Sequence, residues 1–429
     1  MADWTLLVGG HRRLDSEHPD GLRRLRETIG NILQVRNLSL LIGAGASFHL
    51  GLPAIRRVSL EAAMEMFAAA EESLESSEEG LLASLLEAKE GNLEEVLASL
   101  SSSLSYARSW KLDSVTSEDS SLSISVVHEL RAKLNFALAK ACELPARIPR
   151  TSPYASKPWE IHQEFFRKVL AARRGELPRM KVFTTNYDVA IERALDESSV
   201  SFFDGFVGSL RRQMRLESYD LDLYFSSEEG ERKLNRVPRA LRLYKIHGSL
   251  NWAARGTISG SQEVVQTGET PSRGDLALIY PTPYKESDTL GYPYADLLRI
   301  FSTTVSASQS ALVVIGYSFA DEHINRLIYQ ALRANPSFSL LVVNPKDVIE
   351  KDAAPEEGRP EPQLTDTRLG RLAALEDPRV MVLTGSTSTF EAMASTMLPD
   401  PSGSENDPGD QQVEEALLGS IEANKVDVQ

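Results

Sequence analysis

The sequence predicts an α/β fold, in which a doubly wound parallel sheet of Rossmann-like layout carries a helical insertion. Residues 311–397 alternate short apolar runs with amphipathic segments, a pattern typical of parallel strands joined by crossover helices. Residues 58–100 are rich in Ala, Leu, Glu and Met, and their apolar side chains recur at helical spacing. The first apolar run, Leu38 to Ile42, ends in a Gly-rich turn, as strands of such sheets often do.

The expected elements begin with an amphipathic helix over residues 21–36 and a buried strand over residues 38–42. Helices are expected over 58–100, 124–145 and 158–174, and the Ser-rich residues 101–123 are expected to form a loop. In the second half of the chain, strands are expected at 182–183, 243–246, 311–316, 338–343 and 379–384. Helices are expected there at 321–334, 366–376 and 389–397. The Pro- and Glu-rich residues 352–363 predict a surface loop.

These elements divide the chain into four parts. Residues 1–36 are expected to form an N-terminal helical segment. The sheet-bearing domain takes residues 37–58 and 178–398, and residues 59–177 form a helical domain inserted into it. Residues 399–429 predict a mostly disordered acidic tail, because they are rich in Pro, Gly, Asp and Glu.

Composition favours an enzyme that stays in the cytoplasm. The chain has 429 residues, of which 42% are hydrophobic, and no apolar run is long enough to span a membrane. The first residues lack the charged-then-apolar pattern of a signal peptide, and the single cysteine, Cys142, excludes an internal disulfide. The net charge of −15 makes direct binding of nucleic acid unexpected.

The Gly-rich turn, Gly43-Ala44-Gly45-Ala46-Ser47, is the first candidate site. Glycines after a buried strand let backbone N–H groups approach a ligand closely, and phosphate is the usual ligand of such a turn. The turn is not the dinucleotide fingerprint, because Phe48 occupies the third glycine position, and it is not a P-loop, because no Lys-Ser/Thr follows. A plain tight turn explains these glycines equally well.

Three later segments also come after apolar, β-rich runs: Thr184-Thr185-Asn186-Tyr187-Asp188, His247-Gly248-Ser249 and Gly316-Tyr317-Ser318-Phe319. In an open α/β sheet, ligands bind outside the carboxyl ends of the strands. We therefore expect the four segments to converge on one crevice.

In this order, the four segments resemble the sirtuin family. The first is similar to the sirtuin Gly-Ala-Gly-x-Ser loop and its trailing Gly-Leu-Pro-x-x-Arg, which ends here at Arg56. Thr185 to Asp188 resembles the sirtuin Gln-Asn-Ile-Asp element, and His247-Gly248 resembles the pair that carries the catalytic histidine. Gly316-x-Ser318 is similar to the family's contact with the adenosine half of NAD, and Asn344 resembles a further adenosine contact.

The chain departs from the sirtuin deacylases in one respect. Those enzymes carry a four-cysteine zinc module after the catalytic histidine, and this chain has no cysteine after His247. It is most similar to zinc-less, sirtuin-like effectors of prokaryotic antiphage defence. That resemblance implies an NAD+ glycohydrolase, which cleaves NAD+ to nicotinamide and ADP-ribose, with NAD+ as substrate and no bound metal.

The resemblance assigns catalytic roles to three residues. Asn186 is expected to hold a ribose hydroxyl or a water, Asp188 to bind the carboxamide or stabilise developing positive charge, and His247 to act as general base. Each has a structural alternative: Asn186 and Asp188 cap the helix that begins near Val189, and His247 is an ordinary core residue.

The binding roles fall to the Gly-rich turn and to the later strand ends. Gly43, Ala44 and Gly45 would meet the pyrophosphate through backbone donors, Ser47 would add a hydroxyl, and Arg56 would supply charge. The adenosine side would be held by Gly316, Ser318 and Asn344. Whether His49, Asp204 and His323 join the site stays open.

Two other functions stay open on the sequence alone. One is an NAD-dependent deacylase or ADP-ribosyltransferase that uses the same pocket, and the other is a sensor that binds NAD or ADP-ribose without turnover. The resemblance further implies a homo-oligomer, or a partner such as a HerA-type ATPase. The apolar helix faces of residues 1–36 and of the insertion would supply the contacts. The activating trigger is not visible in the sequence.

Overall fold

The computed structural model describes most of the chain. The described residues are 3–52, 58–117, 120–143, 159–225, 235–256, 262–268, 270–271, 273, 276–278, 292–346, 348, 364–365 and 367–400. The predicted surface loop at 352–363 and nearly all of the predicted tail, from residue 401 on, lie outside these residues.

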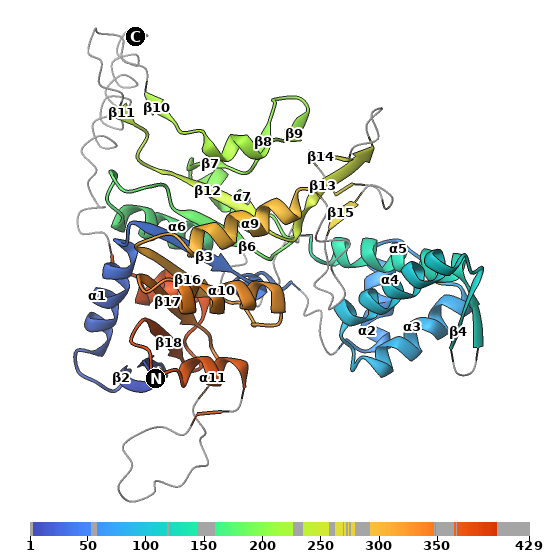
Figure 1. The fold of residues 1–429 in the computed structure, drawn as a ribbon, viewed down its shortest axis with the longest axis horizontal. Coiled ribbons are helices and arrows are strands. Elements are labelled where there is room, and N and C mark those ends of the chain that lie inside the picture. Colours follow the sequence, from blue (N-terminus) through green and yellow to red (C-terminus); the bar gives the residue numbers. More distant parts are fainter. Residues whose placement is uncertain are drawn as a thin grey trace, which may run out of the picture.

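A nine-stranded sheet forms the centre of the molecule, with strand order β2-β1-β18-β17-β16-β3-β6-β12-β7 (Figure 1). Seven neighbouring strands are parallel: β18 (Val380–Thr384), β17 (Phe338–Val343), β16 (Ser310–Ile315), β3 (Asn37–Ile42), β6 (Lys181–Thr184), β12 (Ala240–Lys245) and β7 (Ser201–Phe203). Most of their residues are buried on both faces, as the continuous apolar runs predict. The predicted α/β class with a doubly wound parallel sheet is confirmed.

The chain changes direction across the sheet beside β3. From β3 it proceeds outward to β6, β7 and β12, and it then returns to place β16 on the other side of β3. The next strands, β17 and β18, continue outward from β16. The topological switch point therefore lies between the carboxyl ends of β3 and β16, where open α/β sheets bind their ligands.

Helices cover both faces of the sheet. One apolar cluster packs one face against α1 (Gly21–Leu33), α6 (Glu160–Ala172), α7 (Ala190–Glu197) and α12 (Phe390–Ala392). A second cluster packs the other face against α9 (Tyr294–Val305), α10 (Glu322–Ala334) and α11 (Arg368–Ala373). Within the described residues, no helix combines the length and the apolar character needed to cross a membrane.

The helical insertion forms a separate body to one side of the sheet (Figure 1). Its four helices, α2 (Leu60–Ala69), α3 (Ser76–Ala88), α4 (Leu93–Trp110) and α5 (Ile124–Ala141), share a core of their own. Helix α6 was expected within this insertion but packs on the sheet instead, because Phe165, Phe166 and Val169 face the sheet core.

The Ser-rich segment 101–123 is not the expected loop. Helix α4 continues through it to Trp110, and β4 (Ser114–Ser117) pairs with β5 (Ser120–Ser123) in a hairpin. Leu97, Leu100 and Ala107 keep an apolar stripe facing the core, so the intervening serines remain on helical turns that packing stabilises.

The N-terminal segment is also not purely helical. Before α1, strands β1 (Thr5–Val8) and β2 (His11–Asp15) form a hairpin that adds two antiparallel strands to the sheet edge at β18. Gly9 and Gly10 connect them with φ values of 57° and 83°, the left-handed conformation that tight two-residue hairpin turns require.

A second, smaller sheet has the strand order β15-β13-β14-β9-β8, and its strands come from both sides of His247 in the chain. Its strands are β8 (Phe206–Val207), β9 (Arg212–Met214), β13 (Gly248–Gly256), β14 (Gln262–Gln266) and β15 (Leu276–Leu278). Trp252 is 1% exposed and packs edge-on against Phe206 at 5.2 Å. Strands β10 (Tyr224–Phe225) and β11 (Asn235–Arg236) form a separate pair.

Candidate functional site

The glycines after β3 and β16 bring two strand ends into backbone contact. The Gly43 N–H donates to the Ile315 carbonyl, and the Gly45 N–H donates to the Gly316 carbonyl, both at 2.9 Å. A Cβ on Gly43 would lie 2.6 Å from the Gly316 oxygen, and a Cβ on Gly45 would lie 2.8 Å from the Gly316 Cα. Glycine is thus required for this close approach at the switch point, so tight packing alone accounts for these positions. Ala44, the next predicted contact, is exposed and begins the 3₁₀ helix η1 (Ala44–Leu50).

Asn186 lies beside the Gly-rich turn. Its Nδ2 donates to the Ser47 Oγ at 3.2 Å, and its backbone N–H donates to the Thr184 Oγ1 at 3.0 Å. The Asn186 side chain is buried, at 6% exposed, and its Oδ1 has no hydrogen-bond partner. Leaving a buried acceptor unpaired costs about 1–3 kcal/mol. This oxygen is therefore available to a bound hydroxyl or water.

Asp188 caps the helix that begins two residues later. Its Oδ1 accepts from the Ala190 N–H at 3.0 Å, at the start of α7. The buried Lys245 ammonium donates to the Asp188 and Tyr187 carbonyls and pairs with the Glu192 carboxylate at 2.8 Å. These bonds fix the turn that carries Asn186, and they match the capping alternative for Asp188.

His247 is held by a carboxylate from the other half of the sheet. Its Nε2 lies 3.1 Å from the Asp321 Oδ2, and the two residues are 5% and 7% exposed. The other oxygen, Asp321 Oδ1, accepts from the backbone N–H groups of His323 and Ile324 and caps α10. When an ionised carboxylate accepts from Nε2–H, the imidazole carries its lone pair on Nδ1. The pair thus orients His247 as a base acting through Nδ1.

Sequence reasoning did not identify Asp321 as a site residue. The available signal was an Asp directly before a helix, which is the usual position of a capping residue. Helix capping accounts for the hydrogen bonds of only one of the two carboxylate oxygens, Oδ1. The second oxygen meets an imidazole 74 residues away in sequence, and the local pattern carries no sign of that contact.

The turn after β16 is held from both sides. The Tyr317 hydroxyl donates to the Asp321 carbonyl at 3.1 Å, and the Asn344 Nδ2 donates to the Tyr317 carbonyl at 3.2 Å. The Asn344 Oδ1 also accepts from the Lys346 N–H at 3.0 Å, so the Asn344 amide braces the turns after β16 and β17. Ser318 is exposed at the tip of the turn, and Gly316 has φ of 66°.

Three further candidates are Arg56, His49 and His323. Arg56 falls in the segment that the structure does not describe. The His49 ring packs at a tilt against the His162 ring, with a centroid distance of 5.1 Å, and burial lowers the pKa of His49 to about 4. The backbone of His323 meets Asp321.

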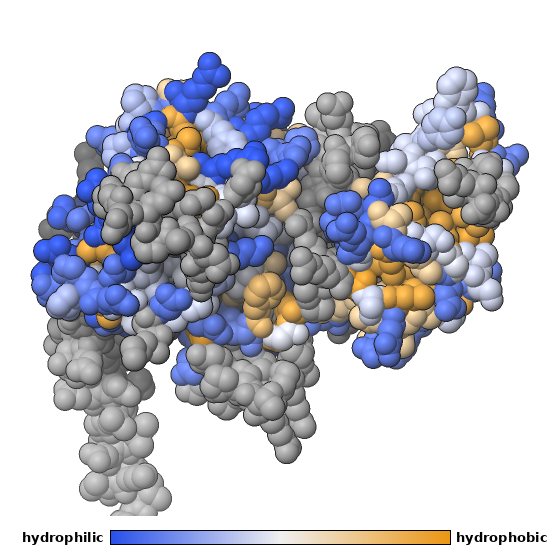
Figure 2. Space-filling model, turned by 90° about the horizontal axis from the view of Figure 1, so that it is seen from below, coloured by the Kyte–Doolittle hydropathy of each residue, from blue (hydrophilic) through white to orange (hydrophobic). Residues whose placement is uncertain are grey.

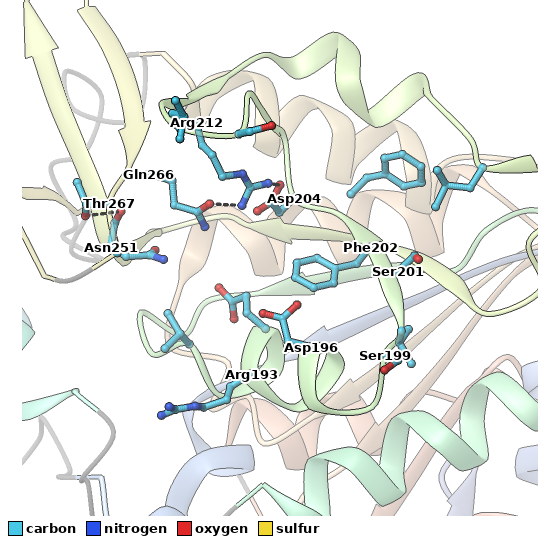
Figure 3. Close-up of a pocket in the computed structure, with 18 residues that line it drawn as sticks. Arg193, Asp196, Ser199, Ser201, Phe202, Asp204, Arg212, Asn251, Gln266 and Thr267 are labelled. Carbon is cyan, nitrogen blue, oxygen red and sulfur yellow. Dashed lines mark hydrogen bonds and ion pairs between the residues drawn. The ribbon is translucent and has the colours of Figure 1, made fainter. Parts of the chain in front are cut away.

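Asp204 lines a separate pocket of about 930 Å³ between α7, the end of β7 and the smaller sheet (Figure 3). Of the residues that the sequence assigned to the site, none lines this pocket. Among the described residues, no three His, Cys, Asp or Glu side chains form a group that could hold a metal ion.

The fold and the converging strand ends define a doubly wound α/β protein with a buried polar site at its switch point. Residues 180–360 match the family model described as the SIR2-like domain. The match includes Asn186, His247 and Asp321, and it excludes the Gly-rich turn.

One solved structure similar to the chain is the crystal structure of a Sir2 homolog–NAD complex. The two are 14% identical, the alignment covers 79% of this chain and 87% of the other, and the TM-score is 0.35. No curated protein matches the chain.

Proposed function

We propose that this protein is an NAD+ glycohydrolase, which uses water to release nicotinamide and ADP-ribose from NAD+. The observation that carries the proposal is the pair of buried polar groups at the switch point of a SIR2-like domain. Asn186 presents an unpaired amide oxygen, and His247 is oriented by Asp321. A site that only bound a nucleotide would not need an imidazole held by a carboxylate.

In the proposed reaction, the bond between the ribose C1′ and the nicotinamide nitrogen breaks, and its electron pair leaves with nicotinamide. The water oxygen bonds to C1′, and the water proton passes to His247 Nδ1 directly or through a ribose hydroxyl. The Asp321 carboxylate stabilises the imidazolium that forms, as the aspartate of a catalytic triad does. Asn186 Oδ1 accepts a hydrogen bond from the ribose hydroxyl or from the water.

The rest of the dinucleotide is proposed to lie along the strand ends. The Gly43 and Gly45 N–H groups already donate to the Ile315 and Gly316 carbonyls, so these two glycines would act by letting the turn approach the pyrophosphate closely. The Ala44 N–H and the Ser47 hydroxyl would then meet the pyrophosphate, with Arg56 supplying positive charge. Gly316, Ser318 and Asn344 would border the adenosine. Asp188 would act on the nicotinamide side only if its carboxylate leaves the Ala190 N–H that it now accepts from.

The segment after His247 favours hydrolysis over deacylation. The single cysteine cannot supply the four thiolates of the zinc module that the sirtuin deacylases carry there. The chain instead runs directly into β13 of the smaller sheet.

The resemblance to antiphage effectors suggests the biological role. A hydrolase that drains NAD+ in the cytoplasm needs control, so we propose a homo-oligomer whose activity is set by a ligand or by a partner such as a HerA-type ATPase. The helical insertion is the proposed contact surface: apolar side chains gather on its face in Figure 2, and α4 carries the exposed Tyr106 and Trp110.

The test is to incubate the purified protein with NAD+ and to separate the products by liquid chromatography, with and without an acetyl-lysine peptide. We expect nicotinamide and ADP-ribose in equal amounts without peptide. Nicotinamide that appears only with peptide, together with O-acetyl-ADP-ribose, would establish a deacylase instead. Binding of NAD+ with no product under either condition would indicate a sensor.

A further inference from the structure

The pocket beside α7 has the features of a binding site and takes no part in the proposed reaction. Its volume of about 930 Å³ falls within the range of small-molecule sites, which is roughly 300–1,000 Å³. Figure 3 shows Asp196 on α7, Asp204 after β7 and Asn251 on β13 facing a common space. Phe202 and Phe203 add aromatic surface to its lining.

Two carboxylates in this pocket each keep one buried oxygen without a partner. Glu192 and Asp204 are 9% and 7% exposed, and Glu192 Oε2 and Asp204 Oδ2 have no hydrogen-bond partner. The second oxygen of each is engaged, Glu192 Oε1 by Lys245 at 2.8 Å and Asp204 Oδ1 by Arg212 at 2.9 Å. The Asn251 Oδ1 is also buried and unpaired. All three unpaired atoms are acceptor oxygens, so a ligand that satisfies them must donate hydrogen bonds.

The basic residues that line the pocket already have partners. Arg212 is held by Asp204 and Gln266, and Arg193 lies 5.1 Å from the Trp159 ring and 3.8 Å from Glu197. Asp196 adds a third carboxylate, and burial followed by the nearby Asp204 charge raises its pKa. The two aromatic rings of Phe202 and Phe203 in the lining favour a ligand with an organic part beside its cationic group.

We propose that this pocket binds a small organic cation that carries a guanidinium or primary ammonium group. Its N–H donors would pair with Glu192 Oε2, Asp204 Oδ2 and Asn251 Oδ1. Charge-assisted bonds of this kind are about twice as strong as neutral ones, and they relieve the cost of the unpaired carboxylate oxygens.

The Lys245 side chain connects the pocket to the turn after β6 that carries Asn186. Lys245 joins the Glu192 carboxylate to the Tyr187 and Asp188 carbonyls, and it lies two residues before His247. A cation bound at Glu192 Oε2 would share the carboxylate with Lys245 and weaken its hold on the turn that carries Asn186. Occupancy of the pocket would therefore change NAD+ turnover, a consequence that rests on the function proposed above.

The binding test uses butylguanidinium as the probe and butylurea as its neutral isostere, added to the full chain. We expect butylguanidinium to raise the melting temperature in a saturable way and to give a calorimetric binding curve, and butylurea to do neither. Equal effects of the two probes, or no effect of either, would overturn the proposal.

Substitutions locate the site. Asp204→Asn keeps an oxygen for Arg212 and for the Phe206 N–H but places a donor where Oδ2 stood, so we expect at least a tenfold loss of butylguanidinium affinity. Asp196→Asn changes an exposed lining residue and serves as a second variant if the first does not fold. Asp220→Asn removes an exposed carboxylate outside the lining and should bind as wild type does. Unchanged affinity in Asp204→Asn or Asp196→Asn, whichever is folded, would contradict the site.

Nicotinamide release is then measured with saturating butylguanidinium. A change of threefold or more in wild type, absent in Asp204→Asn, supports the coupling, and an unchanged rate in a protein that binds the probe refutes it. If the protein releases no nicotinamide under any condition, the proposed hydrolase activity is wrong. The melting and calorimetric results still decide whether the pocket binds an organic cation.

Discussion

The two oxygens of the Asp321 carboxylate bond to two different parts of the molecule, the start of α10 and the His247 imidazole. Oδ1 caps α10 through two backbone N–H groups, and Oδ2 meets the His247 imidazole. The same residue therefore ties the start of a helix in one half of the sheet to the proposed base in the other half. Its two roles can be separated by substitution, because an amide keeps one oxygen acceptor and replaces the other by a donor.

The first prediction concerns this pair. In Asp321→Asn, Oδ1 still caps α10, but Nδ2 now donates to His247 Nε2 and moves the imidazole lone pair to the wrong nitrogen. By analogy with the serine-protease triad, we expect nicotinamide release to fall by about 10²–10⁴-fold with a melting temperature near that of wild type. Asp321→Ser keeps the cap alone and is the matched control, with a similar loss of rate. Wild-type turnover in Asp321→Asn would remove Asp321 from the mechanism.

The second prediction concerns the two buried polar groups themselves. His247→Ala removes the proposed base, and Asn186→Ala removes the proposed acceptor for the ribose or the water. Each should reduce nicotinamide release at least 100-fold, while calorimetry still detects NAD+ binding, because the turns after β3 and β16 are unchanged. Retained turnover in either variant would show that the residue has been assigned the wrong role.

At the scale of elements, the contact between the turns after β3 and β16 depends on glycine. In the third prediction, Gly43→Ala places a Cβ 2.6 Å from the Gly316 oxygen, and one of the two turns must move. We expect a loss of unfolding free energy of more than about 1 kcal/mol and weaker NAD+ binding.

The matched control for Gly43→Ala is Gly80→Ala in α3. A Cβ on Gly80 meets nothing within 4 Å. Alanine there should stabilise the protein by about 0.5–1 kcal/mol, because it restricts the unfolded chain within a helix. Denaturant unfolding gives the free energy of unfolding of both variants. Equal changes in the two would mean that the close approach between the two turns does not require glycine at position 43.

Two histidines in ring contact, His49 of η1 and His162 of α6, make the packing of η1 against α6 sensitive to acid. Burial lowers the pKa of His49 to about 4, and burial together with the His49 charge lowers the pKa of His162. Phe390 of α12 packs against both rings. Burial thus favours the neutral form of both imidazoles in the folded state.

The fourth prediction is the resulting pH dependence. Between about pH 6.5 and 4 the unfolded chain binds protons that the folded chain does not, so stability falls as the pH falls through this window. His49 alone would cost up to about 2 kcal/mol at pH 5. His49→Gln should flatten the decline in melting temperature between pH 7 and 5, whereas His18→Gln, on the surface, should leave it unchanged. An identical decline in His49→Gln would exclude His49 as the cause.

At the scale of the whole molecule, strands β13, β14 and β15 of the smaller sheet occupy the part of the chain where the resemblance places a zinc module. Its core is made by side chains such as Trp252 and Val264, which are 1% and 2% exposed. The fifth prediction is that chelators leave melting temperature and activity unchanged, whereas Trp252→Ala costs about 3–5 kcal/mol of unfolding free energy. Metal analysis that finds one zinc per chain would contradict it.

The sequence predicts the central strands best, because parallel strands buried on both faces give apolar runs such as Leu312 to Ile315 that little else produces. The N-terminal hairpin was missed, because its strands of four and five residues are too short for a reliable alternation. The Ser-rich end of α4 was missed, because packing by Leu97 and Leu100 overrides weak helix propensity. Site residues at strand ends could be predicted, because they directly follow apolar runs in the sequence. Contacts between distant segments, such as His247 with Asp321, leave no local pattern and could not be predicted.

The placement of β16 between β3 and β17 has a consequence for synthesis of the protein. The hydrogen bond from Asn186 to Ser47 joins residues 139 apart, and β16, which completes the switch point, ends at residue 315, well after β3 ends at residue 42. At about 5–20 residues per second, a ribosome needs roughly 15 to 55 s to make that interval. Throughout it, the Gly-rich turn has been translated without the strand it must contact. The switch-point site therefore cannot form on a nascent chain that ends before β16. Under the function proposed above, NAD+ hydrolysis would begin only once most of the sequence has left the ribosome.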